Sequence, residues 1–154
     1  MERHQVDLVD LSSISVTLEN VSYRNVLSVK DVFSRFLWLR AIPNKNSDTV
    51  ANELYKIYIK FRQPKILQSD QGSEFKGSVI KLCSELNTKL IYSSSGHPQS
   101  QGKSERSHRT WKEKLQRDIL LTKTRRDCDW VTGLPALQRI YNEGWHTVYS
   151  NDAI

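Results

Sequence analysis

The sequence has 154 residues and a formal net charge of +6, and a chain of this length is one ordinary domain that can bury a hydrophobic core. Apolar residues make up 38% of it and charged residues 26%, proportions that exclude a membrane-spanning protein and a disordered tail. Two cysteines are too few for a disulfide framework and the N-terminal residues lack a signal-peptide pattern, so we expect an intracellular protein.

The N-terminal part of the chain predicts a small antiparallel sheet. Three stretches rich in β-branched and aromatic residues are separated by short polar segments, which is typical of strands joined as a meander. They are residues 5–11, 25–31 and 35–42. The first is expected to be the buried strand, and it carries two carboxylates, Asp7 and Asp10.

The rest of the chain alternates helices with short strands. Pro43 ends the third strand, and residues 47–61 repeat apolar side chains at helical spacing, with Asn46 or Ser47 placed to cap the helix. A strand, a helix, a strand, a loop rich in Gly and Ser, and two helices follow. These six elements are expected at residues 65–69, 79–86, 89–92, 93–102, 103–119 and about 129–142. The order βββαβαβαα indicates one α/β domain with a mixed sheet.

The positive charge is concentrated in one segment. Residues 103–126 contain nine basic and three acidic residues, so this segment alone carries a charge of +6 and the rest of the chain sums to zero. A basic stripe of this kind favours a polyanionic partner, with nucleic acid preferred over an acidic membrane. A solvated helix face that binds nothing would show the same pattern, so charge alone does not decide between them.

Three carboxylates stand where a metal site could form. Asp7 lies in the first strand, Asp70 follows the strand at 65–69, and Glu105 lies in the first turn of the basic helix. Open α/β sheets place their sites at the carboxyl ends of strands, and carboxylates that converge there need cations such as Mg²⁺. A pair of such ions supports in-line phosphoryl transfer. Each residue also has a structural interpretation: a strand residue facing solvent, a turn residue and a helix N-terminal glutamate.

Four segments resemble the catalytic core of retroviral and gypsy-like LTR-retrotransposon integrases. They are HQVDLVDL (4–11), DVFSRFLWLRAIPNK (31–45), SDQGSEF (69–75) and HPQSQGKSER (97–106). The resemblance covers about residues 4–147, with the segments in the family's order. It implies a ribonuclease H-like fold, a five-stranded mixed sheet flanked by helices, as a single domain over residues 1–154. The zinc module and the DNA-binding module that flank the core in complete integrases are not recognised within it.

The resemblance also implies the site residues. The family's catalytic acids fall on Asp7, Asp70 and Glu105, which would hold Mg²⁺ or Mn²⁺, as a pair of ions. Contacts to DNA are expected from a glutamine of the loop and from cations of the basic helix: Gln101, Lys103, Arg106, Arg109, Lys112 and Arg117. We interpret Asp31 as structural, positioning the start of a strand hairpin, and assign Asp10 no role. The family usually has Trp at the position of His4.

Two functions stay open on the sequence alone. The chain is either an integrase core, which performs metal-dependent DNA end processing and strand transfer, or a domesticated or degraded derivative that binds DNA or protein without catalysis. The intact acidic triad favours the first. The resemblance further implies element ends and target DNA as partners, a homodimer or higher oligomer, and a nuclear location. A ribonuclease H acting on RNA–DNA hybrids would share the metal chemistry, but HPQSQGKSER does not support it.

Overall fold

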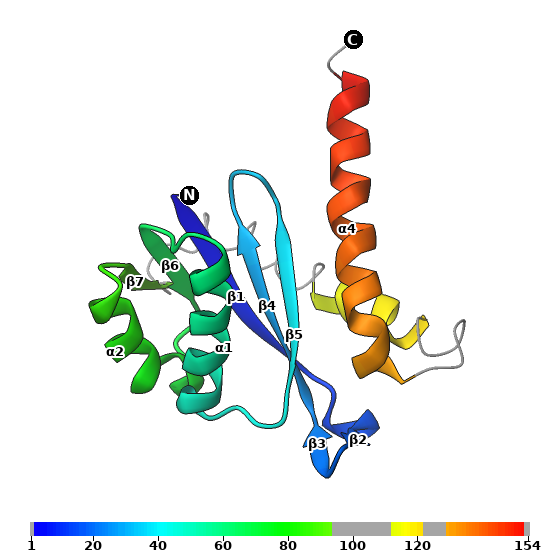
Figure 1. The fold of residues 1–154 in the computed structure, drawn as a ribbon, viewed down its shortest axis with the longest axis horizontal. Helices are drawn as coiled ribbons and strands as arrows, with labels where there is room; N and C mark the ends of the chain where they lie inside the picture. The colour runs from blue at the N-terminus through cyan, green and yellow to red at the C-terminus, as the bar shows by residue number, and fades with distance from the viewer. Residues whose placement is uncertain (1, 94–111, 122–128, 153–154) are drawn as a thin grey trace.

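The structure is a computed structural model that describes residues 2–93, 112–121 and 129–152, the stretch 145–152 by its backbone alone. At its centre is a five-stranded mixed sheet in the order β5-β4-β1-β6-β7 (Figure 1). The strands are β1 (Arg3–Asp10), β4 (Asn25–Asp31), β5 (Leu37–Ile42), β6 (Ile66–Ser69) and β7 (Lys89–Tyr92). β1, β4 and β5 form antiparallel pairs, and β6 and β7 continue the sheet in parallel from β1. The predicted fold class is confirmed.

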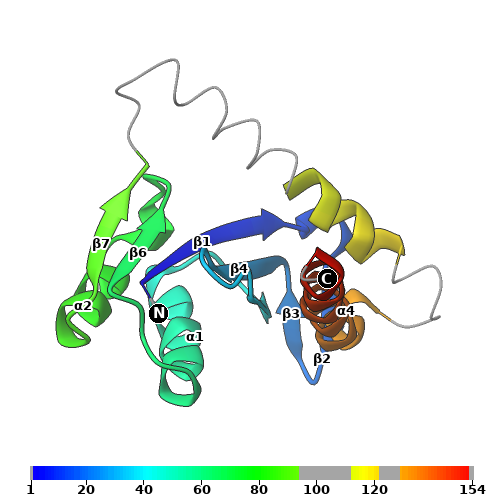
Figure 2. The ribbon, with the colours of Figure 1, turned by 90° about the horizontal axis from the view of Figure 1, so that it is seen from above.

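Helices cover both faces of the sheet. One face packs against α1 (Ser47–Lys60) and α2 (Ser78–Glu85), and the other packs against a helix over residues 112–121 and α4 (Trp130–Asp152). Figure 2 shows α1 and α2 on one side of the sheet, with the 112–121 helix beside the far end of β1. Among the described residues, no helix is long and apolar enough to span a membrane.

The two helical layers create two cores that meet at the central strand. Val6 and Leu8 of β1 face the core beneath α1 and α2, whereas Val9 faces the core that contains Leu115 and Ile119 of the 112–121 helix. A strand with protein on both faces carries apolar residues on both, as a strand in the middle of a layered α/β fold does. β1 is therefore the element on which both halves of the fold converge.

Several element boundaries differ from the predictions. A hairpin of β2 (Val16–Leu18) and β3 (Val21–Tyr23) was not predicted; its turn uses Glu19 and Asn20, both at positive φ, where Gly would be the stronger signal. Two 3₁₀ turns, Ser12–Ile14 and Ser73–Phe75, also appear. α4 runs to Asp152, past the predicted end at 142, and it contains Pro135 in its second turn.

The cysteine expectation and the remaining predicted elements are tested in part. Cys83 is a buried free thiol, and Cys128 lies outside the described residues. Of the loop predicted at 93–102 and the helix predicted at 103–119, only Ser93 and residues 112–119 are described, and the latter are helical.

The backbone groups on the outer edge of β5 form hydrogen bonds with side chains of α4 instead of with another strand. The Leu37 N–H donates to Asn142 Oδ1 at 2.8 Å, and Asn142 Nδ2 donates back to the Leu37 carbonyl at 3.0 Å. One turn earlier on the helix, Gln138 Oε1 accepts from the Leu39 N–H at 2.8 Å. Two amides spaced one helical turn apart thus reproduce the hydrogen bonds that a neighbouring strand would make.

We expect Asn142→Ala to lower the free energy of unfolding by about 1–3 kcal/mol, because both backbone groups of Leu37 would lose their partner in a partly buried place. Urea denaturation measures the change. Glu143→Ala is the matched control, since its surface pair with Arg139 is exposed and contributes under about 1 kcal/mol. Equal losses in the two variants would show that water replaces the amide.

A buried histidine begins the first core. His4 is fully buried, its Nδ1 lies 3.3 Å from the Tyr58 hydroxyl oxygen, and its ring centroid lies 5.2 Å from that of Trp38. Burial lowers the pKa of His4 from 6.5 to about 4, although the nearby charge of Asp31 opposes this. The imidazole is therefore neutral in the folded protein at neutral pH, and its ring packs against the aromatic rings of Trp38 and Tyr58.

The lowered pKa of His4 predicts a stability that depends on pH. Between about pH 6.5 and pH 4 the unfolded chain binds a proton at this residue and the folded protein does not, so stability falls as the pH falls through this window. Relative to His4→Phe, the wild type should lose about 3 kcal/mol over the window. Chemical denaturation of both proteins at several pH values tests this, and parallel curves would contradict it.

Candidate active site

Two of the three predicted acids lie near one another, Asp7 within β1 and Asp70 directly after the adjacent strand β6. In the parallel ladder of β1 and β6, Gln5 lies opposite Gln68. Asp7 comes two residues later in β1, and Asp70 comes two residues later along the chain, just past the end of β6. Burial raises the pKa of Asp7, and the nearby negative charge of Asp70 raises it further, as expected for neighbouring carboxylates.

The Asp7 carboxylate is held by two donors. Its Oδ1 accepts a hydrogen bond from the Leu8 N–H at 3.0 Å and an ion pair from Lys112 Nζ at 2.8 Å. The Asp7 side chain is only 18% exposed, so burial raises its pKa, and the bond and charge of Lys112 oppose that effect in part. The sequence placed Lys112 at DNA phosphates; the structure places its ammonium on a predicted catalytic acid.

Asp70 follows β6 directly and shapes the turn there. Its Oδ1 accepts from the Gly72 N–H at 2.7 Å, and the Ser69 hydroxyl donates to its carbonyl oxygen at 2.9 Å. An added Cβ at Gly72 would lie 2.5 Å from the Glu74 carboxylate, so the flexible Glu74 side chain would have to move aside. The turn interpretation of Asp70 is correct, and its exposed carboxylate is still near enough to raise the pKa of Asp7, so a turn role and a metal-binding role are compatible.

The third acid and most predicted DNA contacts lie outside the described residues. These are Glu105, Gln101, Lys103, Arg106 and Arg109, together with Trp111, which was expected to anchor the helix. Lys112 and Arg117 are described: the first reaches Asp7, and the second is exposed on the same helix. Lys112 is two helical turns from Glu105 in the predicted helix, a spacing that puts both on one face.

The 112–121 helix is fixed in place by its other face and by α4. Leu115 and Ile119 are buried in the second core, as predicted. The Tyr141 hydroxyl of α4 donates to the Asp118 carboxylate, and the Lys114 ammonium lies 5.1 Å from the centroid of the Tyr141 ring. These contacts hold the backbone of the helix, so the reach of Lys112 towards β1 is set by the fold.

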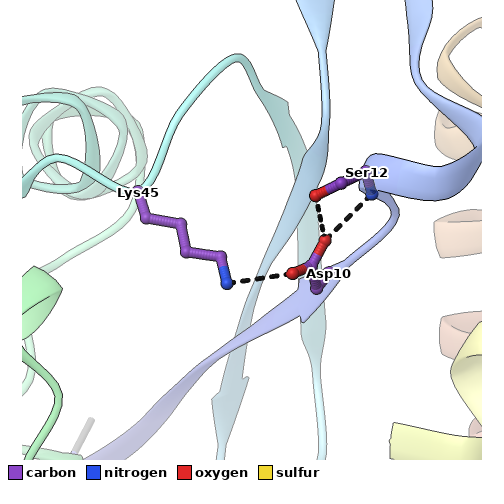
Figure 3. Close-up of polar contacts among 3 residues, drawn as sticks. All are labelled: Asp10, Ser12 and Lys45. Carbon is purple, nitrogen blue, oxygen red and sulfur yellow. Dashed lines mark hydrogen bonds and ion pairs between the residues drawn. The ribbon is translucent and has the colours of Figure 1, made fainter.

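Asp10, to which the sequence analysis assigned no role, lies away from Asp7 and contacts Ser12 and Lys45 (Figure 3). Its carboxylate accepts from the Ser12 N–H at 2.9 Å, from the Ser12 hydroxyl, and from Lys45 Nζ at 3.1 Å. The bonds to Ser12 and then Lys45 lower the pKa of Asp10 to about 2. Asp10 is an odd number of residues from Asp7, so the two point to opposite faces of the strand. Asp10 thus ends β1 and joins it to the segment before α1.

Asp31 has the structural role predicted for it. Its carboxylate accepts from the Ser34 hydroxyl at 2.6 Å and from the Phe33 N–H at 3.3 Å, while its carbonyl accepts from the Arg35 N–H at 2.8 Å. The turn between β4 and β5 closes around this one residue, and Arg35 adopts a positive φ of 65° to complete it. The prediction that Asp31 positions the hairpin is confirmed.

The pair of Asp7 and Asp70 suits a hard divalent cation. Both offer carboxylate oxygens, the ligands that such ions prefer, and a cation, the Lys112 ammonium, already stands at Asp7. Within the residues that the structure describes, no group of three or more potential metal ligands occurs. The third ligand that the resemblance implies, Glu105, falls outside that part of the chain.

Comparison with known proteins gives consistent results. The integrase core domain family matches residues 2–98. The chain is 40% identical over 109 residues to the Retrovirus-related Pol polyprotein from transposon 412 of Drosophila melanogaster, covering 68% of this chain and 8% of that protein. It is 29% identical over 143 residues to the KRAB-A domain-containing protein 2 of Homo sapiens, covering 92% of this chain and 28% of that protein.

The fold is also similar to that of a solved structure. A chain in the simian T-cell lymphotropic virus intasome in complex with PP2A regulatory subunit B56 gamma superposes with a TM-score of 0.64. The superposition covers 90% of this chain and 47% of that chain at 16% sequence identity, so it shows a shared fold. The present chain thus spans less than a third of the two relatives above and about half of this one.

We expect Asp7→Asn to be at least as stable as the wild type at neutral pH without metal, because burial and Asp70 disfavour the charged form of Asp7. A raised folded pKa means that ionisation of Asp7 costs stability as the pH rises through it. At this chain length each kcal/mol gained raises Tm by about 2–4 °C.

Asp10→Asn is the matched control for this measurement. It removes a carboxylate whose pKa is lowered to about 2, so its Tm should fall. Thermal unfolding in a chelating buffer compares the variants, and a lower Tm for Asp7→Asn than for the wild type would show that the Lys112 contact outweighs burial.

Proposed function

The chain belongs to the integrase core domain family, and we propose that it is the part of an integrase that performs polynucleotidyl transfer on DNA. The observation that carries the proposal is the placement of two carboxylates near one another in the middle of the sheet: Asp7 within β1, and Asp70 directly after the adjacent parallel strand β6, close enough for its charge to raise the pKa of Asp7. Two carboxylates in such a place repel one another unless cations neutralise them. The family match and this geometry point to the same chemistry.

We assign the metal ligands to Asp7, Asp70 and Glu105. Divalent cations, Mg²⁺ or Mn²⁺ and most simply a pair, would neutralise the phosphate oxygens and activate the attacking hydroxyl. Asp7 would hold the cations together with Asp70, since it lies in β1, between β4 and β6, and the charge of Asp70 acts on its pKa. The sheet fixes the two aspartates, and the basic helix would bring Glu105 to them. The reaction would be DNA end processing followed by attack of the freed 3′-hydroxyl on target DNA.

The DNA would lie along the basic helix. Lys112 and Arg117 would contact phosphates, and Gln101, Lys103, Arg106 and Arg109 would extend the same surface. Phosphate contacts position a duplex without reading its sequence, which suits an enzyme that acts on varied target sites. Element ends and target DNA are the proposed partners, with a homodimer or higher oligomer and a nuclear location.

A second candidate function is supported by one comparison. A human protein named for a KRAB-A domain matches 92% of the chain, whereas the Drosophila relative is named as a Pol polyprotein. A derived domain that binds DNA or protein without catalysis would keep the fold and the basic helix. The presence of all three acids favours catalysis.

We expect Asp7→Asn, Asp70→Asn and Glu105→Gln each to reduce strand transfer by at least about 100-fold, because a neutral amide offsets less of the cation's charge than a carboxylate does. The assay joins a labelled duplex to plasmid DNA in Mg²⁺ or Mn²⁺, with EDTA as the blank and an RNA–DNA hybrid to detect ribonuclease H activity.

The control for that assay is Asp10→Asn, which alters a carboxylate on the opposite face of β1 and should retain strand transfer if it folds. Wild-type levels of joining by purified Asp7→Asn would refute the assigned triad. DNA binding by the wild type with no joining in either metal would favour the second candidate.

A further inference from the structure

The contact between Lys112 and Asp7 joins the two halves of the proposed site. Lys112 Nζ lies 2.8 Å from Asp7 Oδ1, with the lysine side chain 40% exposed and the aspartate 18% exposed. Asp7 comes from the central strand and Lys112 from the helix packed on the second face (Figure 2). The Lys112 ammonium therefore contacts the Asp7 oxygen that would bind a metal ion in the proposed function.

The Lys112 ammonium alone does not neutralise the two carboxylates. When both are ionised, Asp7 and Asp70 carry two negative charges, and one ammonium balances only one of them. A divalent cation at the pair would balance both. It would also repel the Lys112 ammonium, since two cations cannot share one carboxylate oxygen without strong repulsion. Metal and ammonium are thus competitors for Asp7.

The geometry of the helix lets the ammonium leave without disturbing the fold. Leu115 and Ile119 hold the backbone of the 112–121 helix in the second core, and Asp118 is tied to Tyr141 of α4. The lysine stem is long and flexible, and its side chain is partly in water. Release needs only a change of side-chain rotamers, which leaves the ammonium free to bind a phosphate.

We propose that Lys112 is an exchangeable counter-ion, which neutralises Asp7 in the metal-free protein and is displaced by the divalent cation to bind a DNA phosphate. The inference rests on the proposed function, because it needs Asp7 and Asp70 to bind metal. It unites the two places assigned to Lys112, the phosphate contact expected from the sequence and the aspartate contact in the structure.

The exchange couples metal binding to DNA binding. When the metal binds, it displaces the Lys112 ammonium, which can then bind a DNA phosphate, so the metal raises the affinity of the protein for DNA. By linkage, DNA raises the affinity for the metal by the same factor. Removal of the Lys112 charge takes away the competitor, so the metal binds more tightly when DNA is absent. Removal of the Lys112 charge also abolishes the part of the coupling between metal binding and DNA binding that depends on this exchange.

The first experiment measures binding of Mn²⁺ without DNA, by calorimetry, in the wild type, Lys112→Gln and Lys114→Gln. Lys112→Gln should bind the ion about tenfold more tightly, the value of one charge-assisted contact. Lys114→Gln removes the same charge from the same helix but contacts Tyr141 instead of Asp7, so its affinity should change less than about twofold. Equal affinities for wild type and Lys112→Gln would overturn the inference.

The second experiment measures DNA binding to a short labelled duplex across a salt series, with Mg²⁺ or with EDTA at matched ionic strength. In the wild type, Mg²⁺ should steepen the slope of log affinity against log salt by about 0.9, the amount for one further phosphate contact. In Lys112→Gln the slope should be the same with and without Mg²⁺. A metal-dependent steepening that survives in Lys112→Gln would overturn the inference.

Asp70→Asn separates failure of the inference from failure of the proposed function. If wild type and Lys112→Gln bind Mn²⁺ alike and Asp70→Asn binds it far more weakly, the metal site stands and the exchange is refuted. If the wild type binds no divalent cation, or Asp70→Asn binds it as well as the wild type does, the proposed metal site is wrong and the exchange falls with it.

Discussion

The burial of β1 on both faces is the constraint on which the rest of the molecule depends. Its apolar residues serve two cores at once, Val6 and Leu8 on one side and Val9 on the other. Asp7 stands among them with little access to water, and its ionised form is disfavoured there. A charge in such a strand must be balanced by another element or by an ion. Lys112 supplies part of that balance.

The elements that meet this demand form a closed ring of contacts around the sheet. Lys112 reaches Asp7 from the 112–121 helix, and Asp118 of that helix is bound by Tyr141 of α4. α4 in turn bonds the edge of β5 through Asn142, and β5 returns through β4 to β1. Each member of the ring is positioned by the next. The position of the Lys112 ammonium therefore depends on the packing of the 112–121 helix and α4 together, and not on one contact alone.

Local patterns were enough to predict the central strands, α1 and the turn role of Asp31, because hydrophobic spacing determines the strands and the helix and short-range hydrogen bonds determine the turn. The β2–β3 hairpin was missed because Glu19 and Asn20 fill a turn where Gly would have signalled it. The orientation of Asp10 and the partner of Lys112 depend on register and on packing between distant segments. One sequence without the fold contains no local signal for either. The three acids were assigned by family resemblance, which stays a prediction, and the structure adds that the charge of Asp70 lies near Asp7.

The amides on the β5 edge bear on how copies of this chain could associate. A strand edge with free N–H and C=O groups recruits strands from other molecules, which leads to β-augmentation or to aggregation. Here Asn142 and Gln138 occupy those groups at Leu37 and Leu39, and β7 at the opposite end of the sheet is only four residues long. Self-association through backbone pairing is disfavoured at β5. An assembly of this fold would have to be built from side-chain surfaces, whose composition can evolve without any change to the sheet.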